Sequence, residues 1–239
     1  GPLRLPPLFE VAHSSLLRVD EFRERLQHCA QLLIAAGADV NQHIFSRWQP
    51  GSLEQPDQNC PLSTLYGAAG SNRDPALTRL LLDAGANPND GESLYHSLEN
   101  PACTRLLLEH GARIAESNAI YRAIDLEDDA ALRLLLAHGG DPNEPARNAP
   151  LTDWGSPLSW AIYRLRPRHA KALLEAGADP SRQTPEGISP YRLALQFGLA
   201  DIADLLKAQT DAPDVSDEER FVAACARGDE AGARAIQAR

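Results

Sequence analysis

The chain is 239 residues long and 43% of its residues are apolar, which is enough to build a sizeable core. It has no apolar run of about 18 residues, no secretory signal pattern and no Asn-x-Ser/Thr site, so we expect a soluble cytoplasmic protein that spans no membrane. The formal net charge of -10 argues against a nucleic acid partner and mildly favours a protein with a basic patch.

One pattern recurs along the chain: an apolar helix that ends at a glycine and is followed by a turn. The glycine allows the left-handed conformation in which many helices end, because it has no Cβ atom to clash. Paired leucines before the glycine supply the buried stripe of the helix. The pattern occurs in AQLLIAAGADVNQ from Ala30, LTRLLLDAGANPND from Leu77, TRLLLEHGARIAE from Thr104, LRLLLAHGGDPNE from Leu132 and AKALLEAGADPSR from Ala170.

A shorter helix is predicted upstream of each of these helices. Its start shows a small residue followed by proline in the first helical turn, where the missing N–H has no cost. Such starts are visible in CPLSTL at 60–65, GSPLSWAI at 155–162 and ISPYRLAL at 188–195. Two antiparallel helices and a turn therefore make one unit.

These residues resemble the ankyrin repeat, which has a period of about 33 residues and a Thr-Pro-Leu-His start to its first helix. The match is strongest in ISPYRLALQFGLADIADLLKAQ from Ile188. The resemblance implies an all-α ankyrin-repeat solenoid of about seven helix-turn-helix units with irregular hairpin fingers. We expect a single array over 3-239, part of a longer chain, with units at 6-41, 60-89, 92-115, 118-143, 156-181, 189-213 and 219-239.

The sequence departs from the family pattern at the histidine of the Thr-Pro-Leu-His start. The residues in its place are Phe9, Ser63, Tyr95, Tyr121, Ser159, Arg192 and Val222. The hydrogen bonds that this histidine supplies in the family must therefore be made in another way. In the last unit, the residues expected at core places are Phe221, Val222, Ala224 and Ile236.

The four cysteines stand at separate repeat positions, so we expect them to be reduced and to bind no zinc. Cys29 and Cys103 both lie eight residues before the glycine of their unit, a place expected to be buried, while Cys60 marks a helix start. The acidic run DLEDDA at 125–130 lacks the spacing of a calcium loop, and we expect it to cap a second helix. No metal and no cofactor are expected.

The connections between units differ in length. The 12 residues from Gly177 to Ser189 match a projecting β-hairpin finger, whereas the 7-residue connections from Gly85 and from Gly111 are too short for one. Two longer connections carry Trp48 and Trp154, each of which either anchors a partner or packs on its own array. Trp160 lies inside a first helix and is expected in the core.

The resemblance also implies a groove lined by the two residues that follow the core alanine pair of each first helix. A groove that runs from acidic to aromatic and basic side chains suits an amphipathic peptide with a basic end, although a solvated surface of mixed charge is the alternative. The candidate partner-binding residues are Trp48, Glu99, Asp125, Trp154, Tyr163, Arg164, Gln196 and Phe197.

No catalytic motif is recognisable, so we expect a non-catalytic module that binds a protein or peptide in its concave groove for regulation or scaffolding. The alternative is a regulatory or substrate-recruiting region of a multidomain enzyme whose catalytic part lies outside this sequence. A monomer is expected, with association through the open last unit as a further alternative.

Overall fold

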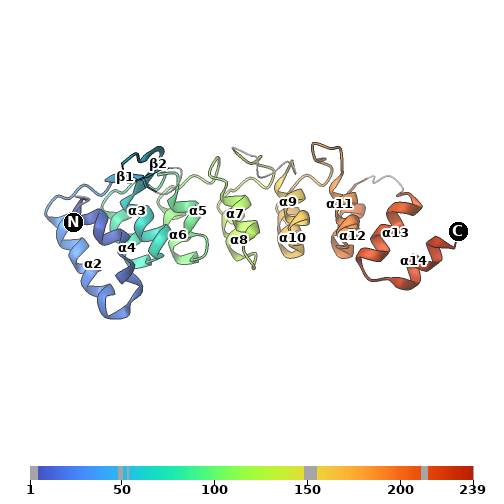
Figure 1. The fold of residues 1–239 in the computed structure, drawn as a ribbon, viewed down its shortest axis with the longest axis horizontal. Coiled ribbons are helices and arrows are strands. Elements are labelled where there is room, and N and C mark those ends of the chain that lie inside the picture. The colour runs from blue at the N-terminus through green and yellow to red at the C-terminus, as the bar shows by residue number, and fades with distance from the viewer. Residues whose placement is uncertain (1–4, 48–50, 53, 148–154, 211–214, 239) are drawn as a thin grey trace. The chain divides into compact units, whose positions relative to one another are not determined.

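The structure is a computed structural model that describes residues 5–47, 51–52, 54–147, 155–210 and 215–238 (Figure 1). The chain forms two compact units, residues 1–119 and 120–239. Within the described residues the fold consists of helix pairs with a single two-stranded sheet, which confirms the predicted all-α repeat architecture. No helix in this part of the chain is long and apolar enough to cross a membrane.

The first unit contains three helix pairs and a hairpin. The first pair is α1 (Pro7–His13) and α2 (Asp20–Ala35), joined by the 3-10 helix η1 (Ser15–Arg18). The other pairs are α3 (Thr64–Tyr66), continued by the π-helical η2 (Gly67–Asn72), with α4 (Pro75–Asp83), and α5 (Ser93–Ser97) with α6 (Pro101–Glu109). The hairpin is β1 (His43–Ser46) antiparallel to β2 (Asp57–Ser63), and it lies in the long connection that follows Gly37.

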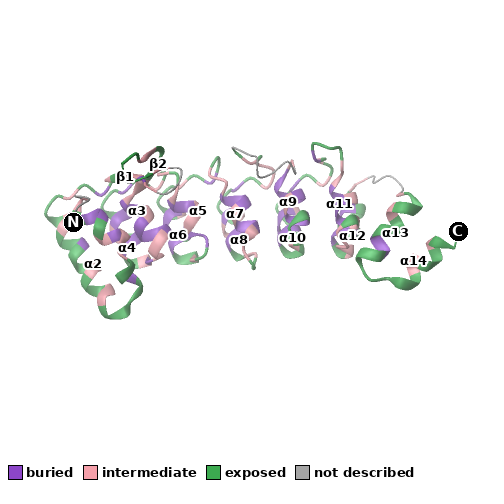
Figure 2. Cartoon of the chain, viewed as in Figure 1, coloured by how far each residue is buried: buried purple, intermediate pink, exposed green. Residues whose placement is uncertain are grey.

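The second unit begins within α7 and contains four helix pairs. They are α7 (Ala119–Asp125) with α8 (Ala130–Ala137), α9 (Pro157–Tyr163) with α10 (Pro167–Glu175), α11 (Pro190–Gln196) with α12 (Ala200–Gln209), and α13 (Asp217–Ala226) with α14 (Glu230–Gln237). In both units the buried residues lie where the helices meet, while the outward faces of the helices stay exposed (Figure 2).

Serine starts the first helices, as the sequence indicates. Ser156 and Ser189 cap α9 and α11 by accepting a hydrogen bond from the backbone N–H three residues on, and a proline follows each. The predicted helix start at CPLSTL is wrong, because Cys60 and Pro61 belong to β2. The helix begins later, at Thr64, because the Ser63 hydroxyl accepts the Tyr66 N–H at 2.8 Å.

In three repeats, an asparagine four residues after the helix-ending glycine joins one helix pair to the next. Asn89 follows Gly85; its Nδ2 donates to the Gly111 carbonyl at 3.2 Å, and its Oδ1 accepts from the Arg113 N–H at 2.8 Å. Asn41 makes the same two bonds to Gly85 and Asn87, and Asn143 makes them to Gly177 and Asp179. One amide thus satisfies a helix-terminal carbonyl and fixes the register between two pairs.

Three of the positions where the family has histidine also connect neighbouring pairs. The Ser63 hydroxyl donates to Asp90, whose carboxylate caps the start of α5 through the Ser93 N–H. Tyr121 donates from its hydroxyl to the Glu144 carbonyl at 3.0 Å, and Arg192 pairs with Glu219 at 3.0 Å. Burial raises the pKa of Tyr121 to about 12, which keeps this hydroxyl a donor.

Three burial predictions are wrong and two are confirmed. Cys103 is buried, but Cys29 is exposed because the buried residue of α2 is its neighbour Ala30, about 100° around the helix. In the last pair, Phe221 and Val222 are 36% and 42% exposed. The buried residues of α13 are Ala223 and Ala224, so its packed face carries small side chains. Ala224 therefore meets the prediction, while Ile236 is only half-buried.

The finger predicted between Gly177 and Ser189 is not a hairpin ladder. These residues form a loop closed by a turn in which the Thr184 N–H donates to the Ile188 carbonyl and the Gly187 N–H donates to the Thr184 carbonyl. The loop packs against Gly155, where an added Cβ would lie 2.9 Å from the Gln183 carbonyl oxygen. The loop is thus held by its turn and by its close approach to Gly155, and not by the pairing of two strands.

A testable consequence concerns the asparagine bridges. Asn89→Ala removes the two hydrogen bonds that join the turn after α4 to the turn after α6. We expect the free energy of unfolding to fall by about 1 to 2 kcal/mol. Urea titration followed by circular dichroism measures the change. Asn59→Ala, an exposed asparagine with no side-chain hydrogen bond within the described residues, is the matched control. Equal effects of the two substitutions would contradict the bridging role.

A second consequence concerns buried histidine. His169 in α10 is 1% exposed, and burial lowers its pKa although the Asp128 backbone and the Asp129 carboxylate oppose that shift. The unfolded chain therefore takes up the proton first as the pH falls, so stability should decrease between about pH 7.5 and 5.

Urea titrations at several pH values test this dependence. We expect His169→Gln to reduce the slope, while Asn59→Ala, which removes no ionisable group, leaves it unchanged. His13 in α1 contributes a slope of the same sign, because burial also lowers its pKa. A profile that is the same for the parent and His169→Gln would overturn the assignment.

Candidate protein-binding site

An aromatic cluster lies at the ends of first helices in the second unit. The Tyr163 ring stacks on Trp160, with centroids 5.6 Å apart and planes inclined at 30°. The Phe197 ring meets Tyr163 edge-on at 5.7 Å, although it follows the next first helix, α11. Tyr163 is 38% exposed, so the cluster presents a ring that two neighbours hold in place.

An ion pair adjoins these rings. The Arg164 Nε donates to Asp125 Oδ1 at 3.0 Å, which connects the end of α9 to the end of α7. The same guanidinium lies over the Trp160 ring at 5.6 Å, in cation–π geometry. Arg166 donates from Nη2 to the Asp125 carbonyl at 3.3 Å. We name Asp125, Trp160, Tyr163, Arg164 and Phe197 the aromatic surface.

The backbone after α9 fixes how these side chains are presented. Leu165 has a left-handed conformation with φ of 56°, which lets the Arg166 N–H reach the Ala161 carbonyl at 2.9 Å. This conformation is unfavourable for a residue with a Cβ atom, by roughly 1 to 2 kcal/mol. The helix end is therefore held by its hydrogen bonds against local strain, with Tyr163 and Arg164 directly before it.

The structure brings together four of the sequence-predicted candidates: Asp125, Tyr163, Arg164 and Phe197. Gln196 is exposed beside Phe197. Trp160 was missed, because it was expected in the core, whereas it is half-buried and supports both Tyr163 and Arg164. The sequence feature that could have identified it is the spacing: Tyr163 and Arg164 stand three and four residues after Trp160, on the same side of the helix. Trp48 and Trp154 lie outside the described residues.

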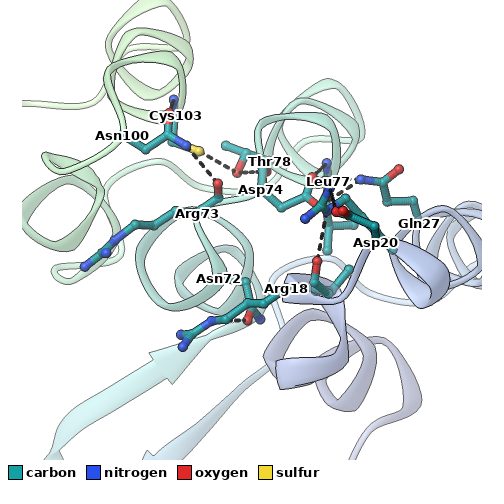
Figure 3. Close-up of polar contacts among 12 residues, drawn as sticks. Arg18, Asp20, Gln27, Asn72, Arg73, Asp74, Leu77, Thr78, Asn100 and Cys103 are labelled. Atoms are coloured by element: carbon teal, nitrogen blue, oxygen red, sulfur yellow. Dashed lines mark hydrogen bonds and ion pairs between the residues drawn. The ribbon is translucent and has the colours of Figure 1, made fainter.

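Glu99 lies in the first unit, where it belongs to a polar network. Its carboxylate pairs with Arg73 at 2.7 Å. Asn100 donates from Nδ2 to the Arg73 carbonyl at 2.9 Å (Figure 3). The adjacent Asp74 is buried and accepts both the Leu77 N–H and the Gln27 side chain. This network connects three helix pairs of the unit, so Glu99 has a structural partner.

The described residues offer little for metal chemistry. No group of three or more His, Cys, Asp or Glu side chains among them is arranged to hold a metal ion. Cys103 is buried beside the Thr78 hydroxyl at 3.7 Å, and burial raises the pKa of its thiol to about 11, so it is not a reactive thiolate near neutral pH. The aromatic surface can instead form packing, cation–π and charged contacts.

Comparison with known proteins concerns the fold of the chain. No family profile and no curated protein matches the sequence. The ankyrin repeat domain of human ASB11 matches with a TM-score of 0.61 and 22% identity, over 86% of this chain and 84% of that one. The ankyrin repeat domain of Bcl-3, a member of the IkappaB protein family, matches with a TM-score of 0.64 and 21% identity, over 87% of each chain.

A third solved structure is the ankyrin repeat domain ABAYE2397 from Acinetobacter baumannii AYE. It matches with a TM-score of 0.63 and 20% identity, over 84% of this chain and 96% of that one. The chain therefore has the ankyrin-repeat fold.

The aromatic surface should be removable with little loss of stability. Tyr163 and Arg164 are partly exposed, and an exposed ion pair contributes only about 0.2 to 1 kcal/mol. We expect Arg164→Ala to lower the free energy of unfolding by less than about 1 kcal/mol, and Tyr163→Ala by about 1 kcal/mol. Urea titration measures both, and a loss as large as that of a buried core residue would show that the cluster is part of the core.

Proposed function

We propose that this ankyrin-repeat chain is a non-catalytic binding module whose aromatic surface holds a peptide segment of a partner protein for regulation or scaffolding. Ankyrin-repeat domains are generally interaction modules and typically non-catalytic, which supports the class of function. The aromatic surface supports its location on this chain.

The observation that carries the proposal is the partly exposed Tyr163, held between the Trp160 and Phe197 rings. Binding sites are enriched in tyrosine, tryptophan and arginine, because these residues bury a large area for few rotatable bonds. A ring that is already immobilised loses little side-chain entropy when a partner covers it. Tyr163 is therefore suited to be the central contact.

The charge of the surface indicates which peptides it favours. Asp125 shares its carboxylate with Arg164, and a basic side chain of a partner can approach the same carboxylate. The net charge of -10 raises the local concentration of basic segments near the chain. We therefore propose an amphipathic peptide with an apolar residue for the rings and a basic end for Asp125.

Selection from a displayed library of random peptides tests this proposal. The immobilised chain should enrich peptides that combine an apolar or aromatic residue with Lys or Arg. We expect Tyr163→Ala to weaken the binding of enriched peptides by 10-fold or more, roughly the loss of a central aromatic contact. Fluorescence anisotropy with the synthesised peptides measures the affinity.

Phe221→Ala is the matched control, since Phe221 is an exposed aromatic residue of α13 outside the aromatic surface. It should leave the affinity unchanged. If enriched peptides bind Tyr163→Ala as tightly as the parent chain, the aromatic surface is not the binding site.

A further inference from the structure

A groove of about 650 Å³ lies between two second helices of the second unit, α10 and α12. It is distinct from the aromatic surface, whose residues come from the ends of the first helices and the turns that follow them. Its floor includes Ile202, which is 2% exposed, and Leu205, which is 37% exposed. The groove therefore offers an apolar strip to a ligand.

The two walls of this groove carry opposite charges. Arg168 and Lys171 stand on α10, and Asp201 and Asp204 stand on α12. Among the residues that the structure describes, none of these four makes an ion pair within 4.0 Å. All four side chains belong to exposed residues. The two walls therefore carry complementary charges that are not paired with each other.

The neighbouring pair of second helices shows the contrasting arrangement. Arg133 stands six residues before Gly139 on α8, as Lys171 stands six residues before Gly177 on α10. Arg133 bridges to Glu175 of α10 at 2.9 Å and to Asp129 at 2.6 Å. An ion pair thus spans α8 and α10. On α12 the place of Glu175 is taken by Ala208, so Lys171 of α10 meets no equivalent carboxylate.

We propose that this groove binds an amphipathic helix of a partner protein. The apolar stripe of that helix would cover Leu205, its acidic flank would face Arg168 and Lys171, and its basic flank would face Asp201 and Asp204. Helices with an apolar stripe bind such grooves through residues spaced three and four apart. The opposite charges of the walls would set the direction in which the helix lies, because reversing it would place like charges together.

The size of the groove favours a helix over a second copy of the chain. α10 has 9 residues and α12 has 10, so the walls are roughly 15 Å long and match a helix of two to three turns. A stable dimer usually buries about 800 Å² on each partner, which is more than two such short helices provide. A helical segment fills the groove without needing further contacts.

Designed helices provide the probe. Three fluorescent peptides share one apolar stripe and differ only in their flanks, which are Glu and Lys on opposite sides, Glu on both sides, or Lys on both sides. We expect the mixed peptide to bind most tightly, by about fivefold over either uniform peptide, as two exposed charge pairs would give. Anisotropy titrations with the whole chain measure the affinities.

A charge reversal distinguishes this recognition from loss of folding. Arg168→Glu with Lys171→Glu makes both walls acidic, so we expect the variant to bind the Lys-flanked peptide more tightly than the mixed one. Misfolding would weaken all three peptides together and could not reverse their order. Leu205→Ser should weaken every peptide, and circular dichroism melting confirms that each variant is folded.

Arg79→Glu with Arg105→Glu is the matched control, because these exposed arginines occupy the position equivalent to Lys171 in the first unit. It should leave peptide binding unchanged, as should Tyr163→Ala, so this test is independent of the aromatic surface. The proposal is overturned if no peptide binds, if the three bind alike, or if the charge reversal leaves their order unchanged. It is also overturned if sedimentation shows that the groove variants change self-association and not peptide binding.

Discussion

The asparagine amide that spans two helix pairs is the contact on which the arrangement of each unit depends. No single pair can bury its own apolar face, so the pairs must stack, and stacking needs a fixed register. Asn41, Asn89 and Asn143 supply it with one donor and one acceptor each, directed at the backbone of the following pair. Because backbone groups are the partners, the bridge is insensitive to which side chains the next pair carries.

The same position in a later repeat shows what happens without the bridge. Ser181 stands four residues after Gly177, but its hydroxyl bonds to Asp179 in its own turn. The last pair is attached differently: Arg192 pairs with Glu219, and Gly198 lies so close to the Ala226 carbonyl that a Cβ would be 2.7 Å away. α14 has no fully buried residue. Short side chains and a charge pair thus replace the amide bridge where the core is smallest.

The sequence correctly predicts features that are determined within a single helix. The glycines, the leucine pairs and the Ser-Pro starts of α9 and α11 depend on local geometry, and all are found where expected. The wrong predictions concern residues whose burial or helix position depends on a neighbouring element. Cys29 differs from buried Ala30 by one residue. The start of α3 lies later than predicted because β2 extends to Ser63, whose hydroxyl caps the helix there. Periodicity alone does not say which side of a helix the next pair occupies.

The candidate site was only partly predictable for the same reason. Repeat positions selected Tyr163 and Phe197 as candidates, but their ring contact exists because stacking brings residues 34 apart in the chain together. The Asp125–Arg164 pair spans 39 residues in the same way. Trp160 was assigned to the core because it lies inside a helix. Its partners are at the exposed end of that helix, which only the structure reveals.

The second unit thus carries two surfaces that differ in how their charges are used. In the aromatic surface, Arg164 is already bonded to Asp125 and lies over Trp160, so a ligand meets groups whose positions are fixed. Such preorganisation favours affinity, because little entropy remains to be lost. In the groove, Arg168, Lys171, Asp201 and Asp204 form no ion pair among the described residues, which favours rapid encounter and a defined orientation over strength. Two segments of one partner that used both surfaces would gain affinity from the link between them, since the second contact would form at a high effective concentration.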